Sequence, residues 1–308
     1  MRNRRALACQ DLMTSLKIPK SSHRVVYLGT PEIAVHPLKE MHKAGIEIAL
    51  VVTGSDKRRG RGNEKGPTAV KLEARKLGIP VSHQLEDICE VNADIGVIVA
   101  YGKLIPEEIL KNLPMVNIHF SLLPRWRGAA PLERAILSGD EHTGVCIMQV
   151  QKKLDTGGIF RSQQVPILKG DSLKSLASKL SVLGSELLLD CFDEGFGIPQ
   201  PQVGNPTYAQ KLTNREQKIE WKNSTEEILR MVRLGNAWTT VKKKRLGVLE
   251  ASERFGESLN IGEIRGTIVG TGNGAIELIA VKPEGKKDME GASWANGLRL
   301  DQEDRLGE

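Results

Sequence analysis

Residues 24–31 read Arg-Val-Val-Tyr-Leu-Gly-Thr-Pro, an apolar run rich in β-branched side chains that stops at a glycine. Such a run is typical of a buried parallel strand that turns directly into a helix. The residues that follow alternate in the same way, and their patterns predict a helix over 31–45, a strand over 46–52 and a helix over 68–78. This alternation predicts an α/β fold with a doubly wound, mostly parallel sheet.

The alternation continues further along the chain. The apolar run at 94–100 predicts another buried strand, and the 3.6-residue apolar period over 172–192 predicts an amphipathic helix. Between these two we expect a short helix at 106–111, a strand at 115–120, a helix at 131–138 and an antiparallel pair of strands at 144–150 and 159–167.

Composition changes near residue 200, where proline and glycine are frequent, as in a linker. Beyond it, short apolar runs broken by glycines predict a smaller C-terminal β-barrel, OB-like, with tight turns. The predicted organisation is an N-terminal extension over 1–23, expected to be poorly ordered, a catalytic α/β domain over 24–196, a linker over 197–206 and the barrel domain over 207–308.

Charge and cysteine usage narrow the classes of function. Lysine plus arginine outnumber aspartate plus glutamate by 44 to 38, a net charge of +6 that favours a polyanionic partner without proving one. The four cysteines and six histidines are dispersed, so we expect a reducing compartment and no metal site. No apolar run reaches the roughly 18 residues of a membrane span, so we expect no membrane partner.

Two polar side chains alternate at the end of the strand predicted at 115–120. Asn117 and His119 are two residues apart, so both side chains point to one face, at the edge where open α/β sheets form crevices. Acyl transfer to an amine needs an oxyanion donor and a proton donor, roles that an amide and an imidazole can fill. Asp155 lies on a loop from which a carboxylate could orient the histidine. Asn and His on a strand are also common structural groups, and Asp before Thr-Gly-Gly is a common turn former, so both interpretations stay open.

The turn at residues 29–31, Gly-Thr-Pro, lacks the three-glycine dinucleotide fingerprint, which argues against nicotinamide binding. No activated serine or cysteine is evident. A substrate α-amine, with a reference pKa of about 7.7 to 8.0, needs none, because part of it is neutral at physiological pH.

Residues 117–136 read Asn-Ile-His-Phe-Ser-Leu-Leu-Pro-Arg-Trp-Arg-Gly-Ala-Ala-Pro-Leu-Glu-Arg-Ala-Ile. This stretch resembles the signature of methionyl-tRNA formyltransferases. Formyltetrahydrofolate enzymes in general share its first part, whereas Arg-Trp-Arg-Gly-Ala-Ala-Pro is narrower. The similarity covers nearly everything after residue 23, with Phe120 and the run 54–56 as local departures.

The resemblance implies transfer of the formyl group of 10-formyltetrahydrofolate to the α-amino group of methionyl initiator tRNA, without a metal. It implies Asn117, His119 and Asp155 as catalytic residues. It implies a folate site at Ser121, Leu122, Leu123, Pro124, Ala100, Tyr101, Gly102 and Leu104. The basic positions expected at the tRNA are Arg58, Arg59, Arg61, Lys65, Arg125, Arg127, Lys242, Lys243, Lys244 and Arg245, although the charge runs among them are also compatible with solvated surfaces.

Three alternatives remain: an amino-sugar formyltransferase with the same core, a hydrolase that releases formate, and a catalytically silent RNA-binding protein. The basic second domain argues against the first, and the intact Asn, His and Asp argue against the last. We expect a cytoplasmic monomer. The alternative location is an organellar matrix, if the first 23 residues are a targeting segment.

Overall fold

The computed structural model describes residues 23–58, 65–298 and 304–308. Those residues form two compact units, each built from several segments of the chain. Of the described residues, one unit comprises those up to Pro124 with Val145–Gln163 and Ser181–Asn205, and the other comprises those in Arg125–Gly144, Gln164–Leu180 and Pro206–Glu308. The predicted extension over 1–23 lies outside the described residues except for His23.

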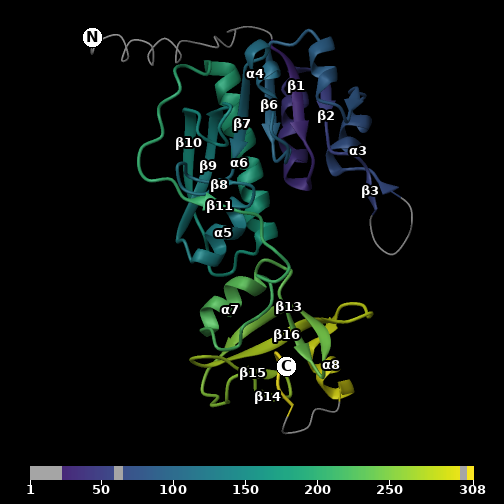
Figure 1. Cartoon of the computed structure of the whole chain (residues 1–308), viewed down its shortest axis with the longest axis vertical. Helices are drawn as coiled ribbons and strands as arrows, with labels where there is room; N and C mark the ends of the chain where they lie inside the picture. The colour runs from purple at the N-terminus through teal and green to yellow at the C-terminus, as the bar shows by residue number, and fades with distance from the viewer. Residues whose placement is uncertain (1–22, 59–64, 299–303) are drawn as a thin grey trace. The chain divides into compact units, whose positions relative to one another are not determined.

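A seven-stranded sheet with the order β10-β9-β7-β6-β1-β2-β5 organises the N-terminal part (Figure 1). Strands β2, β1, β6 and β7 are parallel, whereas β7 and β9 are antiparallel. The predicted doubly wound, mostly parallel sheet is therefore confirmed. Its strands are β1 (Arg24–Gly29), β2 (Glu47–Val52), β5 (Val81–Ser82), β6 (Ile95–Val99), β7 (Met115–His119), β9 (His142–Gln149) and β10 (Ile159–Pro166).

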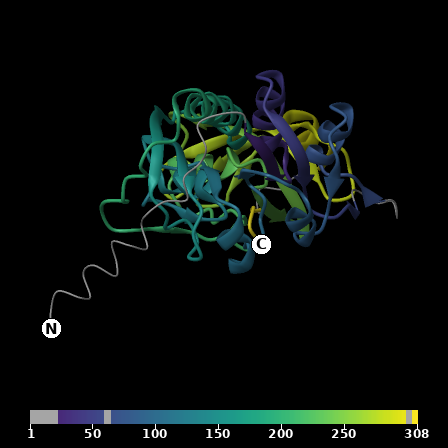
Figure 2. The same ribbon diagram turned by 90° about the horizontal axis from the view of Figure 1, so that it is seen from above.

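The central strands β1 and β6 are buried along almost their whole length, so both faces of this sheet are covered. On one face, α6 (Leu173–Glu194) packs so closely that a Cβ at Gly184 would come within 2.7 Å of Ile118. Figure 2 views the same helix end-on beside the sheet. Among the described residues, the other helices before the C-terminal part are η1 (Glu32–Ala34), α2 (Val35–Lys43), α3 (Ala69–Lys76), η2 (Glu86–Glu90), α4 (Glu107–Asn112) and α5 (Pro131–Ser138).

Two short strand pairs are absent from the sequence prediction. β3 (Lys57–Arg58) pairs with β4 (Lys65–Gly66), and β8 (Arg127–Gly128) pairs with β11 (Tyr208–Ala209). Two-residue strands carry no readable period, so pattern analysis misses them.

The C-terminal part is an antiparallel sheet with two helices packed on it, which confirms the predicted second β domain. Its helix α7 (Thr225–Val232) was not predicted, although Ser224 and Glu227 form a capping box that signals a helix start. Trp221 and Trp294 are buried in its core. The other elements are β12 (Trp238–Val241), β13 (Lys244–Arg254), β14 (Ile264–Arg265), β15 (Ile268–Gly270), β16 (Ala275–Pro283), β17 (Met289–Glu290) and α8 (Gly291–Leu298).

Candidate active site

The residues predicted to act in catalysis or ligand binding lie at the carboxyl ends of neighbouring strands of the seven-stranded sheet, or in the loops that follow them. β1 pairs with β2 on one side and with β6 on the other, so the chain order reverses between β1 and β6. Open α/β sheets form their ligand crevice at such a reversal, outside the carboxyl ends of the strands. The loops after β1, β2, β6 and β7 are therefore the place to look for a site.

Strand β7 carries Asn117 and His119 on one face, as predicted. Asn117 pairs with Met148, and His119 pairs with Cys146, across the β7–β9 ladder. The imidazole is almost fully buried, with 4% of His119 exposed, whereas Asn117 is half-buried. Within the described part of the chain the Asn117 amide makes no side-chain hydrogen bond, so its N–H groups can serve a ligand.

Asp155 reaches His119 from the loop between β9 and β10. Its Oδ2 lies 3.7 Å from Nδ1 of His119, and the carboxylate side chain is 10% exposed. The backbone of Asp155 is left-handed, with φ of 51°, a conformation that aspartate tolerates better than most residues. The structure thus brings together the imidazole and the carboxylate that the sequence placed on separate elements.

The loop that carries Asp155 passes very close to strand β9. A Cβ on Gly157 would overlap the carbonyl oxygen of Gln149, so only glycine fits there. The backbone N–H of Gln149 donates to the carbonyl of Gly158 at 2.8 Å, and this bond fixes the end of the loop to the strand. Gln202 donates from its side chain to the carbonyls of Asp155 and Gly157. The sequence prediction missed Gln202, since a single amide in a proline-rich stretch carries no pattern.

Cys146 is the residue paired with the histidine in the ladder, and paired residues share a face of the sheet. Burial raises the pKa of the Cys146 thiol to about 11. A thiol with that pKa is neutral at physiological pH and is a poor nucleophile. Covalent catalysis through Cys146 is therefore disfavoured.

The predicted folate turn, residues 121–124, follows β7 directly. Ser121 is fully buried, and Leu123 packs on Cys146 and Met148. Leu122 and Pro124 are partly exposed. These contacts fix the turn beside His119, so the part of it that a ligand can touch is small.

The second predicted folate segment follows β6. Ala100 and Gly102 both have left-handed backbones, with φ of 47° and 80°, and both are exposed. Leu104 is 70% exposed, an unusual state for a large apolar side chain, whereas Tyr101 is buried. Burial, and then the nearby Glu86, raise the pKa of Tyr101. The loop therefore offers apolar surface and backbone groups to a flat ligand, while the buried Tyr101 anchors it to the core.

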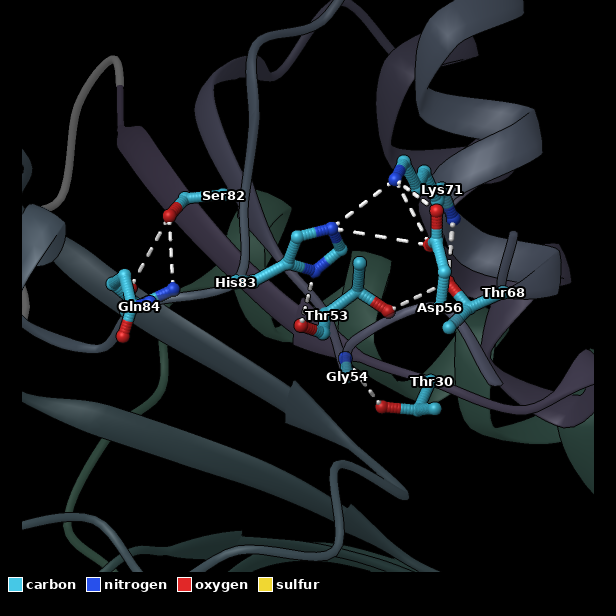
Figure 3. A network of polar contacts seen from close by, with 9 residues as sticks. All are labelled: Thr30, Thr53, Gly54, Asp56, Thr68, Lys71, Ser82, His83 and Gln84. Atoms are coloured by element: carbon cyan, nitrogen blue, oxygen red, sulfur yellow. Dashed lines mark hydrogen bonds and ion pairs between the residues drawn. The ribbon is translucent and has the colours of Figure 1, made fainter. Parts of the chain in front are cut away.

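A dense polar cluster lies at the end of β2 and was not predicted from the sequence (Figure 3). The ammonium of Lys71, on α3, donates to both carboxylate oxygens of Asp56, at 2.9 and 2.7 Å, and approaches Nε2 of His83 at 3.1 Å. His83 Nδ1 lies 3.1 Å from the carbonyl of Thr53. Since Lys71 can only donate, Nε2 of His83 accepts and Nδ1 carries the proton that bonds Thr53. The cluster ties β2, α3 and the chain after β5 together.

The predicted tRNA contacts in the basic segment after Asp56 are only partly described. Arg58 and Lys65 are paired across the β3–β4 ladder, while Arg59 and Arg61 lie outside the described residues. Asp56 immediately precedes β3, so the polar cluster of Lys71, Asp56 and His83, here called the Lys71 cluster, lies at the base of this ladder.

The predicted contacts Arg125 and Arg127 flank a left-handed tryptophan. The Arg125 guanidinium binds Asp140, with Nε to Oδ2 at 2.8 Å, and stacks over the ring of Trp126 at 4.5 Å. The indole of Trp126 donates to the same carboxylate at 2.8 Å. Arg125 is therefore engaged within the fold, although its side chain stays 45% exposed. Arg127 is half-buried in β8.

The cations Lys242 to Arg245 lie at the exposed end of the hairpin that β12 and β13 form. Lys242 and Lys243 occupy its two-residue turn with φ of 47° and 62°, positions that usually hold Asn and Gly. Arg245 stacks on Trp238 at 4.3 Å. Lys242 lies 3.0 Å from Asp304. All four side chains thus gather at one hairpin tip, where Lys242 and Arg245 already have partners.

Among the described residues, no cluster of three or more His, Cys, Asp or Glu side chains is placed to bind a metal ion. The helices in the described ranges include none with the length and apolar character required to cross a membrane.

Comparison with known proteins identifies both parts of the chain. Residues 23–191 match the formyl transferase family, and residues 211–299 match the formyl transferase C-terminal domain. A methionyl-tRNA formyltransferase of Cereibacter sphaeroides is 36% identical over 294 residues, which span 90% of this chain and 97% of that protein. One of Clavibacter sepedonicus is 37% identical over 296 residues, 89% of this chain and 97% of that protein.

Solved structures share the fold at lower identity. The methionyl-tRNA formyltransferase of Clostridium thermocellum has a TM-score of 0.57 at 19% identity, covering 76% of this chain and 95% of that one. WlaRD, a sugar 3N-formyl transferase, has a TM-score of 0.64 at 18% identity, covering 87% of this chain and all of that one. The identity and coverage of the sequence relatives are the stronger finding, and they place this chain in the methionyl-tRNA formyltransferase family.

Proposed function

We propose that Asn117, His119 and Asp155 carry out the reaction of this family in this chain. The chain is a formyltransferase that uses 10-formyltetrahydrofolate as donor and formylates the amino group of methionine on initiator tRNA. The observation that supports the residue assignment is the approach of the Asp155 carboxylate to within 3.7 Å of His119, beside the strand position of Asn117.

Asn117 is the proposed donor to the formyl oxygen. An amide N–H stabilises the negative charge that gathers on that oxygen when the amine adds to the carbonyl carbon. The half-buried side chain has no competing hydrogen bond among the described residues, so it need not break a contact to act. This availability suits Asn117 to a ligand-binding role.

His119 is the proposed proton carrier, and Asp155 its orienting partner. The incoming amine loses a proton as the new C–N bond forms, and the departing nitrogen of the folate gains one as the old C–N bond breaks. A carboxylate near Nδ1 leaves Nε2 to face the substrates. The 3.7 Å separation is longer than a hydrogen bond, and catalytic contacts of this kind often tighten when substrate binds.

The residues around the site fit a folate. Bound 10-formyltetrahydrofolate supplies the carbon that is transferred, and the exposed Leu104 and the left-handed Ala100 and Gly102 would hold its flat ring system. Ser121 to Pro124 are the proposed second wall. The rest of the chain's task is to orient the amine and to keep water from the formyl group.

The RNA contacts are also proposals. Arg58, Arg59, Arg61, Lys65, Arg127 and the hairpin Lys242 to Arg245 are the proposed phosphate contacts, with Arg125 as a further one despite its bond to Asp140. Removing one phosphate contact should reduce the slope of log affinity against log salt by about 0.7 to 0.9. Neutralising Lys243 and Lys244 should therefore flatten that slope for tRNA binding, and an unchanged slope would place the contacts elsewhere.

The organisation of the chain is proposed in the same way. A catalytic domain over 24–196, a linker over 197–206 and a tRNA-binding domain over 207–308 are the proposed limits. Because the product serves the start of translation, we place the enzyme in the cytoplasm, and as a monomer.

The decisive experiment offers labelled 10-formyltetrahydrofolate with methionyl initiator tRNA, with an amino-sugar nucleotide, or with water alone. Label on the methionyl-tRNA supports the proposal. Label on the sugar or in free formate would keep the chemistry but reject the acceptor. Tight tRNA binding with no transfer would favour the silent RNA-binding protein.

A further inference from the structure

Gln202 holds the loop of the catalytic carboxylate although it lies between the residues that the two family models match. Its side-chain nitrogen Nε2 donates to the carbonyl of Asp155 at 2.9 Å and to the carbonyl of Gly157 at 2.8 Å. Both N–H groups of one amide are thus used on the backbone of a single short loop. One acceptor belongs to Asp155 itself.

The loop needs such a support. Asp155 is left-handed, a conformation that costs free energy for a residue with a Cβ even though aspartate tolerates it better than most, so contacts that hold the backbone there favour it. At the C-terminal end the loop is fixed by the bond from Gln149 to Gly158, and at the start by the Thr156 hydroxyl, which donates to the carbonyl of Lys153 at 2.9 Å. Gln202 fixes the part between, where the catalytic carboxylate is attached.

The segment that presents Gln202 is itself anchored. Gln200 and Ile159 exchange two backbone hydrogen bonds of 2.8 Å each, so the chain two residues before Gln202 is bonded to the start of β10. Gly204, two residues after it, lies so near Pro124 of the proposed folate turn that an added Cβ would be 3.8 Å from the proline ring. Gln202 therefore connects the Asp155 loop to a fixed point.

We propose that Gln202 is a positioning residue that sets the distance between the Asp155 carboxylate and His119. This inference rests on the proposed catalytic roles of those two residues. The two bonds from Gln202 end on backbone carbonyls, so they hold the loop without taking part in proton transfer. Their loss lets the Asp155 backbone leave the left-handed conformation and carries the carboxylate away from the imidazole.

The test is to replace Gln202 with methionine, which keeps the length of the side chain and removes both donors. Displacements of about 1 Å at reacting groups lower turnover by up to about 100-fold, so kcat should fall by about 10- to 100-fold. The KM values for folate and for methionyl-tRNA should stay within about twofold, because a change at Gln202 acts through the loop and not on substrate binding.

Gln200→Met is the matched control. Gln200 is exposed, and among the described residues its side-chain amide bonds to the carbonyl of Ile198 in its own segment, at 3.1 Å. The control should keep wild-type kcat. An equal loss of kcat in Gln200→Met would attribute the effect to the segment as a whole and overturn the inference.

A double-mutant cycle separates positioning from general stability. If Gln202 acts through Asp155, then Gln202→Met should have almost no further effect on kcat in an Asp155→Asn protein. Full additivity of the two losses would contradict the proposal.

A readout independent of activity keeps this inference distinct from the proposed function. Hydrogen–deuterium exchange at residues 153–158 should accelerate in Gln202→Met and not in Gln200→Met. If the wild-type chain fails to formylate methionyl-tRNA, the proposed function fails, while faster exchange would still support Gln202 as the support of the loop. Unchanged exchange would reject it.

Discussion

Two polar clusters lie at the carboxyl edge of the same sheet and are built in opposite ways. In the Lys71 cluster the charged groups bind each other directly, with Lys71 to Asp56 at 2.7 Å. In the proposed catalytic pair the side chains of His119 and Asp155 are 3.7 Å apart, and the backbone of Asp155 is held by an uncharged side chain, Gln202. The first arrangement joins elements of the fold through charged side chains, whereas the second holds the two side chains of the proposed site apart through the backbone of a loop.

Changing one charged residue should therefore affect turnover in one cluster and stability in the other. Changes in the catalytic pair should lower turnover without lowering stability. Changes in the Lys71 cluster should lower stability with little effect on turnover.

Among the changes that compare the two clusters, Asp155→Asn should have the largest effect. The amide keeps the shape of the carboxylate but cannot stabilise a charged imidazole, so kcat should fall by about 100- to 1000-fold, the range seen for lost electrostatic partners at reacting centres. The melting temperature should stay within about 2 °C of the wild-type value, because asparagine keeps the size of the side chain and the Asp155 backbone stays bonded to Gln202. Steady-state kinetics measure the fall in kcat, and a thermal melt measures the melting temperature. A large fall in melting temperature would show that Asp155 is a structural residue.

Gly157→Ala should have the next largest effect, on both properties. The new methyl group overlaps the carbonyl of Gln149, so the loop must move and take Asp155 with it. We expect kcat to fall by about 10-fold or more and stability by about 1–3 kcal/mol, as for other overpacked sites. Gly170→Ala, where an added Cβ meets nothing within 4 Å, is the control. Wild-type kinetics in Gly157→Ala would contradict the close packing of the loop.

Lys71→Met should lower the melting temperature by about 2–4 °C, the change expected for a modest loss of stability in a chain of this size. Asp56 and His83 lose their shared donor, while the methionine fills the space of the aliphatic stem. Turnover should stay within about twofold of wild type. Lys76 lies on the same helix, and its exposed ammonium pairs with Glu73 at 3.2 Å. The control Lys76→Met should therefore change neither the melting temperature nor the turnover. A fall in kcat without a fall in stability would contradict the distinction between the clusters.

The smallest effect concerns pH. The hydrogen bond from Lys71, opposed in part by burial, lowers the pKa of Asp56 below its usual value of 3.8. A carboxylate with a lowered pKa in the folded state stabilises the fold above its unfolded pKa, and this contribution is lost as the pH falls through the folded value. Melting temperatures of wild type and Asp56→Asn should therefore differ at neutral pH, and the difference should shrink as the pH falls from about 4 through the lowered pKa of Asp56. A constant difference at all pH values would exclude the ionised pair as the cause.

Much of the fold was predictable from sequence because long apolar strands and the period of α6 leave clear patterns. Asn117 and His119 were predictable as a pair since alternation on a strand fixes their common face. The approach of Asp155 could only be suggested, because a loop conformation depends on contacts such as Gly157 against Gln149. Lys71 and Gln202 could not be found at all, since one lies in a helix like any surface lysine and the other in a segment with linker composition.

The most direct test of the catalytic assignment is the single-turnover rate of formyl transfer to methionyl initiator tRNA by wild type and by His119→Ala, both saturated with 10-formyltetrahydrofolate. Folding of the variant is checked by its melting temperature. Loss of the proton carrier should slow the chemical step by about 100- to 10,000-fold while the protein stays folded. A folded His119→Ala protein that transfers the formyl group at the wild-type rate would contradict the proposal that His119 carries the proton.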